Sequence, residues 1–106
     1  MDNKNLKTFC ENIVNANKQQ RLSFFHFADR KTVKYIREIA VNILLNDSFT
    51  LSAQEKNYLQ RKVHHIKDIA SRYTSLYKKR EIFVAQHLLV KKLAIITLKH
   101  LDTVQT

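Results

Sequence analysis

The chain has 106 residues, a formal net charge of +10, 44% hydrophobic residues, and neither glycine nor proline. Its length suits one domain with a core of its own, and its apolar fraction is too high for a disordered chain. Without glycine and proline, tight β-turns are disfavoured and glycine-rich phosphate loops are excluded, so we expect an all-α fold.

The first helix is predicted over residues 4–16, where apolar residues recur at helical spacing. Cys10 lies within this apolar stripe and is expected to be a small buried side chain. It is the single cysteine of the chain, so an internal disulfide is excluded.

Residues 19–27 are predicted to form a short aromatic helix or turn. If they were exposed, Phe24, Phe25 and Phe27 could stack on bases. We expect them in the core, because a small helical domain needs bulky apolar anchors and these residues lie outside the most basic part of the chain.

The next two helices are marked by their N-terminal capping residues. Asp29 is a suitable N-cap for a third helix over 30–45. After a loop, Ser52 and Glu55 form a capping box, which satisfies backbone N–H groups at the start of a helix. The apolar stripe behind it predicts a fourth helix over 53–71.

The last helix is predicted over 76–101, after a start signal at Thr74 and Ser75. It is apolar on more than one side, so it lies either at the centre of a bundle or against a partner. The residues of its second apolar side, the candidate partner-binding set, are Phe83, Val90, Ala94, Leu98 and Leu101. Together the elements predict a compact all-α bundle of four or five helices, one domain over 1–106, with a basic helix-turn-helix-like part over 52–101.

Positive charge is concentrated between residues 56 and 92, where ten basic residues stand against two acidic ones, a local net charge of +8. A field this one-sided favours a polyanion, above all nucleic acid. Near 71–80, helix N-terminal N–H groups, hydroxyls and cations occur together, as phosphate oxygens require. The predicted nucleic-acid-binding residues are Lys56, Arg61, Lys67, Arg72, Thr74, Ser75, Lys78, Lys79 and Arg80.

Three alternatives to backbone binding follow from the same residues. The charge could simply be a solvated face that maintains solubility. Base-specific reading by the last helix is disfavoured because that helix is too apolar for a DNA groove. An anionic membrane surface could bind Lys91, Lys92 and Lys99 among their apolar neighbours, but the sequence supports this partner less than nucleic acid.

Neither catalytic nor metal-binding motifs are found. The five histidines lack the H-x₃-H and H-E-x-x-H spacings of metal sites, and no cysteine pair accompanies them. His64 and His65 are adjacent, so on a helix they point about 100° apart and are poorly placed to share a metal. We therefore expect no enzymatic activity, no metal and no cofactor.

Targeting and membrane-spanning segments are also not evident. The N-terminal residues include acids and no long apolar run, unlike a signal peptide. The most apolar stretch, 82–101, is interrupted by polar and basic residues and falls short of the roughly 18 apolar residues that a span requires. We expect an intracellular, nuclear or virion-associated protein, neither secreted nor transmembrane.

Residues 27–86 follow a recognisable order of features: an Asp-led helix, a short loop to Leu-Ser, a Lys/Arg-rich helix, then Ser-Leu and a second basic cluster. The residues that carry it are Asp29, Glu38, Asn42, Leu44, Leu51, Ser52, Leu59, Ile69, Ala70, Ser75, Leu76, Lys79 and Arg80. This order resembles small basic proteins encoded beside adenovirus-like genes in Polinton/Maverick elements and adintoviruses. The chain departs from them at Asp47, where members often have glycine, and it lacks their Gly-Gly-Phe-like segment. The resemblance implies a virion-core or genome-associated role.

The sequence thus predicts a non-specific nucleic-acid-binding protein that contacts the backbone, with double-stranded DNA favoured over RNA. The alternative is a non-enzymatic helical interaction or scaffold module that forms a homodimer or binds another protein through its C-terminal apolar helix. The first predicts steep salt dependence of binding, whereas the second predicts little, because apolar burial dominates such interfaces.

Overall fold

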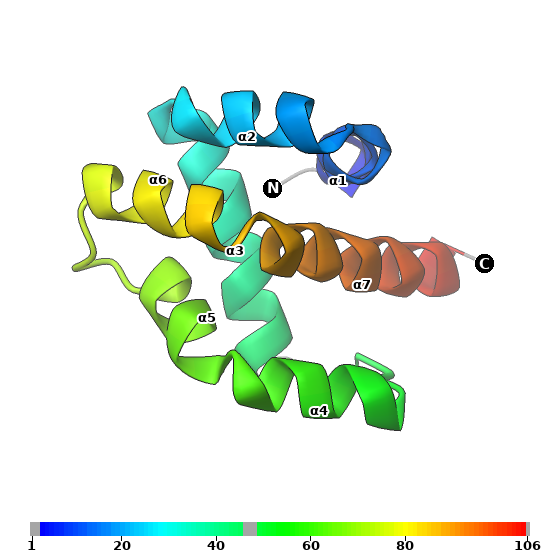
Figure 1. Ribbon diagram of the computed structural model, residues 1–106. Helices are drawn as coiled ribbons and strands as arrows, with labels where there is room; N and C mark the ends of the chain where they lie inside the picture. The colour runs from blue at the N-terminus through cyan, green and yellow to red at the C-terminus, as the bar shows by residue number, and fades with distance from the viewer. Residues whose placement is uncertain (1–2, 46–48, 106) are drawn as a thin grey trace.

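Seven helices make up residues 3–45 and 49–105, the part of the chain that the computed structural model describes, and no strand occurs in this part. They are α1 (Asn3–Asn15), α2 (Lys18–His26), α3 (Arg30–Leu45), α4 (Ala53–Arg61), α5 (Val63–Ala70), α6 (Leu76–Ala85) and α7 (His87–Gln105), shown in Figure 1. The predicted all-α class is confirmed. The predicted number of four or five helices is wrong, because each of the last two predicted helices is divided.

The divisions fall at Lys62 and Gln86. Their backbone angles, φ −107° and ψ 10° for Lys62 and φ −115° and ψ 41° for Gln86, interrupt the helical path. Lys62 Nζ donates a hydrogen bond to Gln86 Oε1 at 3.1 Å, so the two interruptions are joined to each other. This pairing links positions 24 residues apart in sequence and is not visible in the periodicity of either segment.

Side-chain caps begin α2, α3 and α4. The predicted capping box of Ser52 and Glu55 is confirmed, with both of its hydrogen bonds formed. Asp29 Oδ1 accepts from the backbone N–H of Thr32 at 2.8 Å, which confirms the start predicted for α3. Asn17 caps α2 through a second capping box that the sequence analysis missed.

In Figure 1, α6 and α7 follow one another through the middle of the molecule, with α1 and α2 on one side and α4 and α5 on the other. Helix α3 crosses behind them and packs against α5, α6 and α7. Helix α7 also packs against α1, and α6 against α2. The radius of gyration of 12.9 Å matches the value of about 13 Å expected for one compact domain of this length.

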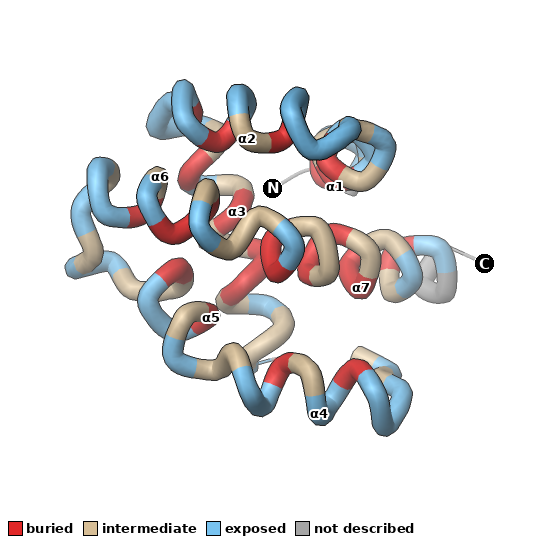
Figure 2. Tube along the Cα trace, viewed as in Figure 1, coloured by how far each residue is buried: buried red, intermediate tan, exposed pale blue. Residues whose placement is uncertain are grey.

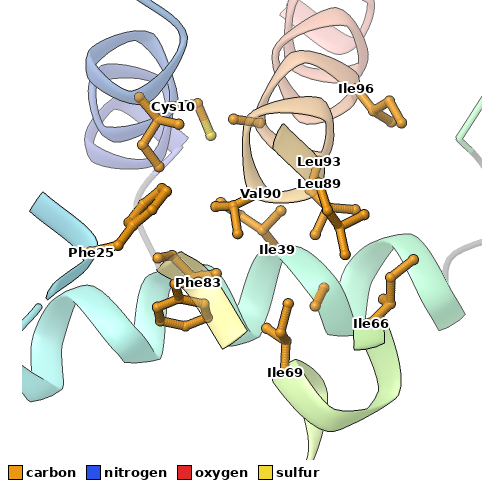
Figure 3. Close-up of a cluster of buried hydrophobic side chains, with 14 of the residues drawn as sticks. Cys10, Phe25, Ile39, Ile66, Ile69, Phe83, Leu89, Val90, Leu93 and Ile96 are labelled. Carbon is orange, nitrogen blue, oxygen red and sulfur yellow. The ribbon is translucent and has the colours of Figure 1, made fainter. Parts of the chain in front are cut away.

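One apolar core joins these helices, with buried residues along the inner sides of α3, α6 and α7 (Figure 2). Its centre is drawn in Figure 3, where Phe25 of α2 lies toward Phe83 of α6, with ring centroids 5.9 Å apart. Cys10 is fully buried, as predicted, and burial raises the pKa of its thiol to about 12. The thiol therefore acts as apolar filling rather than as a nucleophile.

The prediction for the three phenylalanines of α2 and its C-terminal end is wrong in part. Phe25 is fully buried, but Phe24 is 41% exposed and Phe27 is 76% exposed. Phe24 and Phe27 lie one and two positions from Phe25 and therefore point away from the helix face that Phe25 occupies. The helix can bring only one of the three into the core.

The candidate partner-binding set is also corrected, because α1 and α3 cover both apolar sides of α7. Phe83, Val90, Ala94 and Leu101 are buried in the core of the chain itself, and Leu98 is partly buried against it. A partner surface built from these residues is therefore not present on the molecule. None of the described helices is long and apolar enough to cross a membrane.

The central position of α7 predicts unequal effects of one substitution at two of its leucines. Leu93 is fully buried and Leu88 is 59% exposed. We expect Leu93→Ala to lower the free energy of unfolding by about 2–5 kcal/mol, because it leaves a cavity. Leu88→Ala should change it by about 0.5 kcal/mol or less. Urea denaturation followed by circular dichroism measures both, and equal losses would contradict this placement of α7.

Candidate nucleic-acid interface

A groove of 1090 Å³ separates α4 from α7, which run in opposite directions (Figure 1). Each helix contributes residues spaced three and four apart, which places them on one face. From the α4 side the groove is lined by Ser52, Gln54, Glu55, Asn57, Tyr58, Gln60 and Arg61, and from the α7 side by Leu88, Lys91, Lys92, Ile95 and Lys99. We call it the α4–α7 groove.

Two polar bridges join the walls of the α4–α7 groove, one at each end. At one end lies the hydrogen bond between Lys62 and Gln86. At the other, Lys99 Nζ lies 2.6 Å from Glu55 Oε2. The lining residues run from Leu88 to Lys99 on one wall and from Ser52 to Arg61 on the other, which corresponds to about 17 Å and about 14 Å at 1.5 Å per residue. The groove is therefore a slot of about 15 Å.

Glu55 is the one carboxylate among the described residues that line the groove, and its charge is already engaged. It is buried, with Oε2 accepting from Lys99 and Oε1 accepting from the backbone N–H of Ser52 at 3.0 Å. The hydrogen bond from Lys99, followed by that from Ser52, lowers the pKa of this carboxyl. With Arg61, Lys91, Lys92 and Lys99 against Glu55, the groove carries a net charge of +3.

The four predicted nucleic-acid-binding residues that precede Thr74 are all exposed, as expected. Lys56 and Arg61 lie on α4, Lys67 lies on α5, and Arg72 lies in the linker between α5 and α6. Of the four, Arg61 lines the α4–α7 groove. The others extend the positive surface beyond it, along α4, α5 and the linker.

The basic cluster predicted at the start of α6 is not assembled as one surface. Lys78 is exposed and lies 3.6 Å from Glu81. Lys79 is buried at 4% exposure, and burial, with a further contribution from Arg37, lowers its pKa. Arg80 is half-buried and donates through Nε to the carbonyl oxygen of Ala28 at 2.7 Å. Consecutive residues on a helix point about 100° apart, so three in a row cannot share one face.

The structure also places Ser75 and Thr74, the two hydroxyl residues predicted to bind nucleic acid in this region. Ser75 Oγ accepts from the backbone N–H of Lys78 at 3.1 Å and caps α6, and Thr74 is half-buried. The start signal predicted at this place is confirmed for Ser75. Its oxygen therefore has a structural role as the N-cap of α6.

Lys91, Lys92 and Lys99 were assigned from sequence only to a possible lipid surface, and the structure places them with Arg61 in the groove. The sequence contains a pattern that indicates this shared face of α7. Leu88, Lys91, Lys92, Ile95 and Lys99 recur at helical spacing and mark the one mainly cationic stripe of an otherwise apolar helix. What the sequence did not contain was the position of α4 opposite this stripe.

The histidines do not gather with other ligand types. The rings of His64 and His65 lie 4.0 Å apart at their centroids. Burial lowers the pKa of His65, and the nearby His64 and Lys62 lower it further. Within residues 3–45 and 49–105, no three His, Cys, Asp or Glu side chains are placed to hold one metal ion.

No family model, curated protein or solved structure matches this chain significantly. The resemblance to small basic proteins of Polinton/Maverick elements and adintoviruses stays a prediction. The function of the α4–α7 groove has to be inferred from its own charge and shape.

The bridge between Glu55 and Lys99 predicts a specific pH dependence of stability. Because folding lowers the pKa of Glu55, this group stabilises the native state above its ordinary value of 4.5, and the contribution is lost as the pH falls through the folded value. Lys99→Met removes the main cause of the lowered pKa. We therefore expect the free energy of unfolding of this variant to depend less steeply on pH below about 4.5.

Urea denaturation from about pH 3 to pH 7 measures this dependence. Lys91→Met is the matched control, because Lys91 lines the same groove but is not the residue bonded to Glu55. It should keep the slope of the wild-type protein. Parallel curves for the wild-type protein and Lys99→Met would show that the bridge does not set the titration of Glu55.

Proposed function

We propose that this protein binds nucleic acid without sequence preference, through contacts between its cations and the phosphate backbone. The observation that carries the proposal is the convergence of Arg61, Lys91 and Lys92 on one groove whose carboxylate is already bonded to Lys99. Cations brought together without a matching acid attract a polyanion, and phosphate contacts supply most of the affinity in non-specific binding.

The dimensions of the groove support a chain of phosphates as the ligand. A slot of about 15 Å is long enough for a few successive phosphates of one strand to lie against its cations. The exposed Lys56, Lys67 and Arg72 lie outside the slot and can contact phosphates farther along the strand. Backbone contacts of this kind hold a nucleic acid without reading its sequence.

Nucleic acid is preferred to a protein partner because of where the apolar residues lie. Of the side chains expected to form a partner surface, Phe83, Val90, Ala94 and Leu101 are buried in the core and Leu98 is partly buried. An anionic lipid surface competes for Lys91 and Lys92, which lie near the exposed Leu88. Vesicles with and without anionic lipid are therefore included as a competitor in the binding measurement. Under the resemblance stated above, the biological setting would be a virion core or a genome-associated complex.

We expect the affinity for nucleic acid to depend steeply on salt concentration and to fall when the cations of the groove are replaced. About six phosphate contacts, one for each cation named above, predict that the logarithm of the binding constant falls with the logarithm of salt concentration with a slope near −5. Replacing Arg61, Lys91 and Lys92 by Gln should weaken binding to a random-sequence duplex and reduce the size of the slope by about 3. Fluorescence anisotropy across a salt series measures both quantities.

The matched control replaces Lys18, Lys31 and Lys34 by Gln. These exposed lysines lie on α2 and α3, outside the groove, and their replacement removes the same total charge. We expect a much smaller change in slope from this variant. Equal effects of the two triple variants would contradict a groove-based site, since binding would then follow net charge alone. Flat, weak binding of the wild-type protein at low salt would overturn the proposed function itself.

A further inference from the structure

One end of the molecule displays three aromatic side chains to solvent. Phe27 ends α2, Tyr73 lies in the linker between α5 and α6, and Tyr77 lies in the first turn of α6; they are 76%, 99% and 72% exposed. Figure 1 places these three segments at the same end, and α2 packs against α6. We call Phe27, Tyr73 and Tyr77 the aromatic end. Large apolar groups that are exposed together often mark a binding surface, whereas single exposed apolar residues are common on any protein.

Contacts between α2 and α6 connect the segments that carry Phe27 and Tyr77. The hydrogen bond from Arg80 to the carbonyl oxygen of Ala28 ties α6 to the residue after Phe27. The ring of Phe27 meets that of His26 edge-on, with centroids 4.7 Å apart. His26 and Tyr77 in turn line one hollow between the two helices. His26 therefore lies next to both rings.

The linker that carries Tyr73 is held by serine hydroxyls at both of its ends. Ser71 Oγ accepts from the backbone N–H of Tyr73 at 3.1 Å, and Ser75 caps α6. The linker and the first turn of α6 are mostly exposed in Figure 2. The backbone is thus ordered by local hydrogen bonds, whereas the Tyr73 ring is left almost entirely in solvent.

Cations accompany the aromatic end. Arg72 precedes Tyr73 and is exposed, and Lys78 follows Tyr77 with 61% of its side chain exposed. Lys78 pairs with Glu81 at 3.6 Å, but surface pairs of this kind contribute little to stability. Lys78 can therefore exchange Glu81 for a phosphate. Each of the two tyrosines has a cation next to it in the sequence.

We propose that the aromatic end stacks on unpaired bases, so that the nucleic acid bound by this protein is single-stranded or contains a single-stranded segment. This inference rests on the proposed function, because phosphate contacts supply the charge-dependent part of the affinity. In a duplex the faces of the bases are stacked on one another and cannot reach exposed rings. In a single strand they are free, and aromatic rings beside cations form the usual binding surface.

A protein partner is the competing occupant, since tyrosine, phenylalanine and arginine are also enriched at protein interfaces. The nearby cations favour nucleic acid. Arg72 lies in the linker between α5, which carries the exposed Lys67, and Tyr73, and Lys78 follows Tyr77. The positive surface of α5 therefore continues along the chain to the aromatic end.

The test compares a labelled oligothymidylate of about 12 nucleotides with a random-sequence duplex of the same length, using the full chain and fluorescence anisotropy. The double variant Tyr73→Ala/Tyr77→Ala should weaken binding to the oligothymidylate by about 10-fold or more, and change duplex binding by less than about 2-fold. Tyr73→Phe/Tyr77→Phe should retain wild-type affinity, because stacking uses the ring and not the hydroxyl. Leu45→Ala, which removes a side chain that is 77% exposed elsewhere, is the matched control and should have no effect.

The outcomes separate this inference from the proposed function. Equal losses on both probes, or unchanged binding of both by the double alanine variant, would overturn base stacking. In either case, a loss caused by replacing Arg61, Lys91 and Lys92 would still uphold backbone binding. Failure of the wild-type protein to bind either probe at low salt would overturn both proposals.

Discussion

Burial of α7 on two sides determines where the positive charge of this protein can lie. Side chains such as Leu89, Leu93 and Ile96 pack into the core, and each contributes about 1.5–3 kcal/mol through burial. A surface cation contributes at most about 1 kcal/mol through ion pairing. The apolar contacts therefore set the rotation of α7 about its axis, and its remaining stripe of lysines is carried to the face opposite α4.

Two polar pairs link the ends of α4 and α7 across the groove. The pairs Lys62–Gln86 and Glu55–Lys99 hold the walls at their two ends. Helix α4 packs mainly against α5 and contributes few residues to the core. Elements with few buried apolar contacts are the ones that move most readily in a folded protein. The wall formed by α4 is thus the part of the groove best able to adjust to a ligand.

Local signals predicted most helix boundaries, and long-range contacts account for most of the errors. The caps at Asp29, Ser52 and Ser75 depend on residues three positions away, and all three were read correctly from sequence. The divisions at Lys62 and Gln86 are linked by a hydrogen bond across 24 residues, which no local pattern contains.

The candidate site could be predicted only in part for the same reason. The outward cations of α4 and α5 follow from helical periodicity, so Lys56, Arg61 and Lys67 were identified. Lys79 lies in a run of basic residues whose composition suggested a cluster, but its place on the helix turns it toward α3. The exposure of Phe27 and the grouping of Arg61 with Lys91 and Lys92 depend on how the helices pack.

The most direct test of the central claim is a residue-resolved titration of the ¹⁵N-labelled protein with a short single-stranded oligonucleotide, followed by amide chemical shifts. The account predicts shifts along α4, in the first turns of α7, and over residues 71–78, at salt concentrations where binding is saturated. Amides of α1 and of the exposed lysine face of α3 should remain unchanged. Shifts centred on α1 and α3 instead, or small uniform shifts over the whole chain, would contradict a nucleic-acid site built from the α4–α7 groove and the aromatic end.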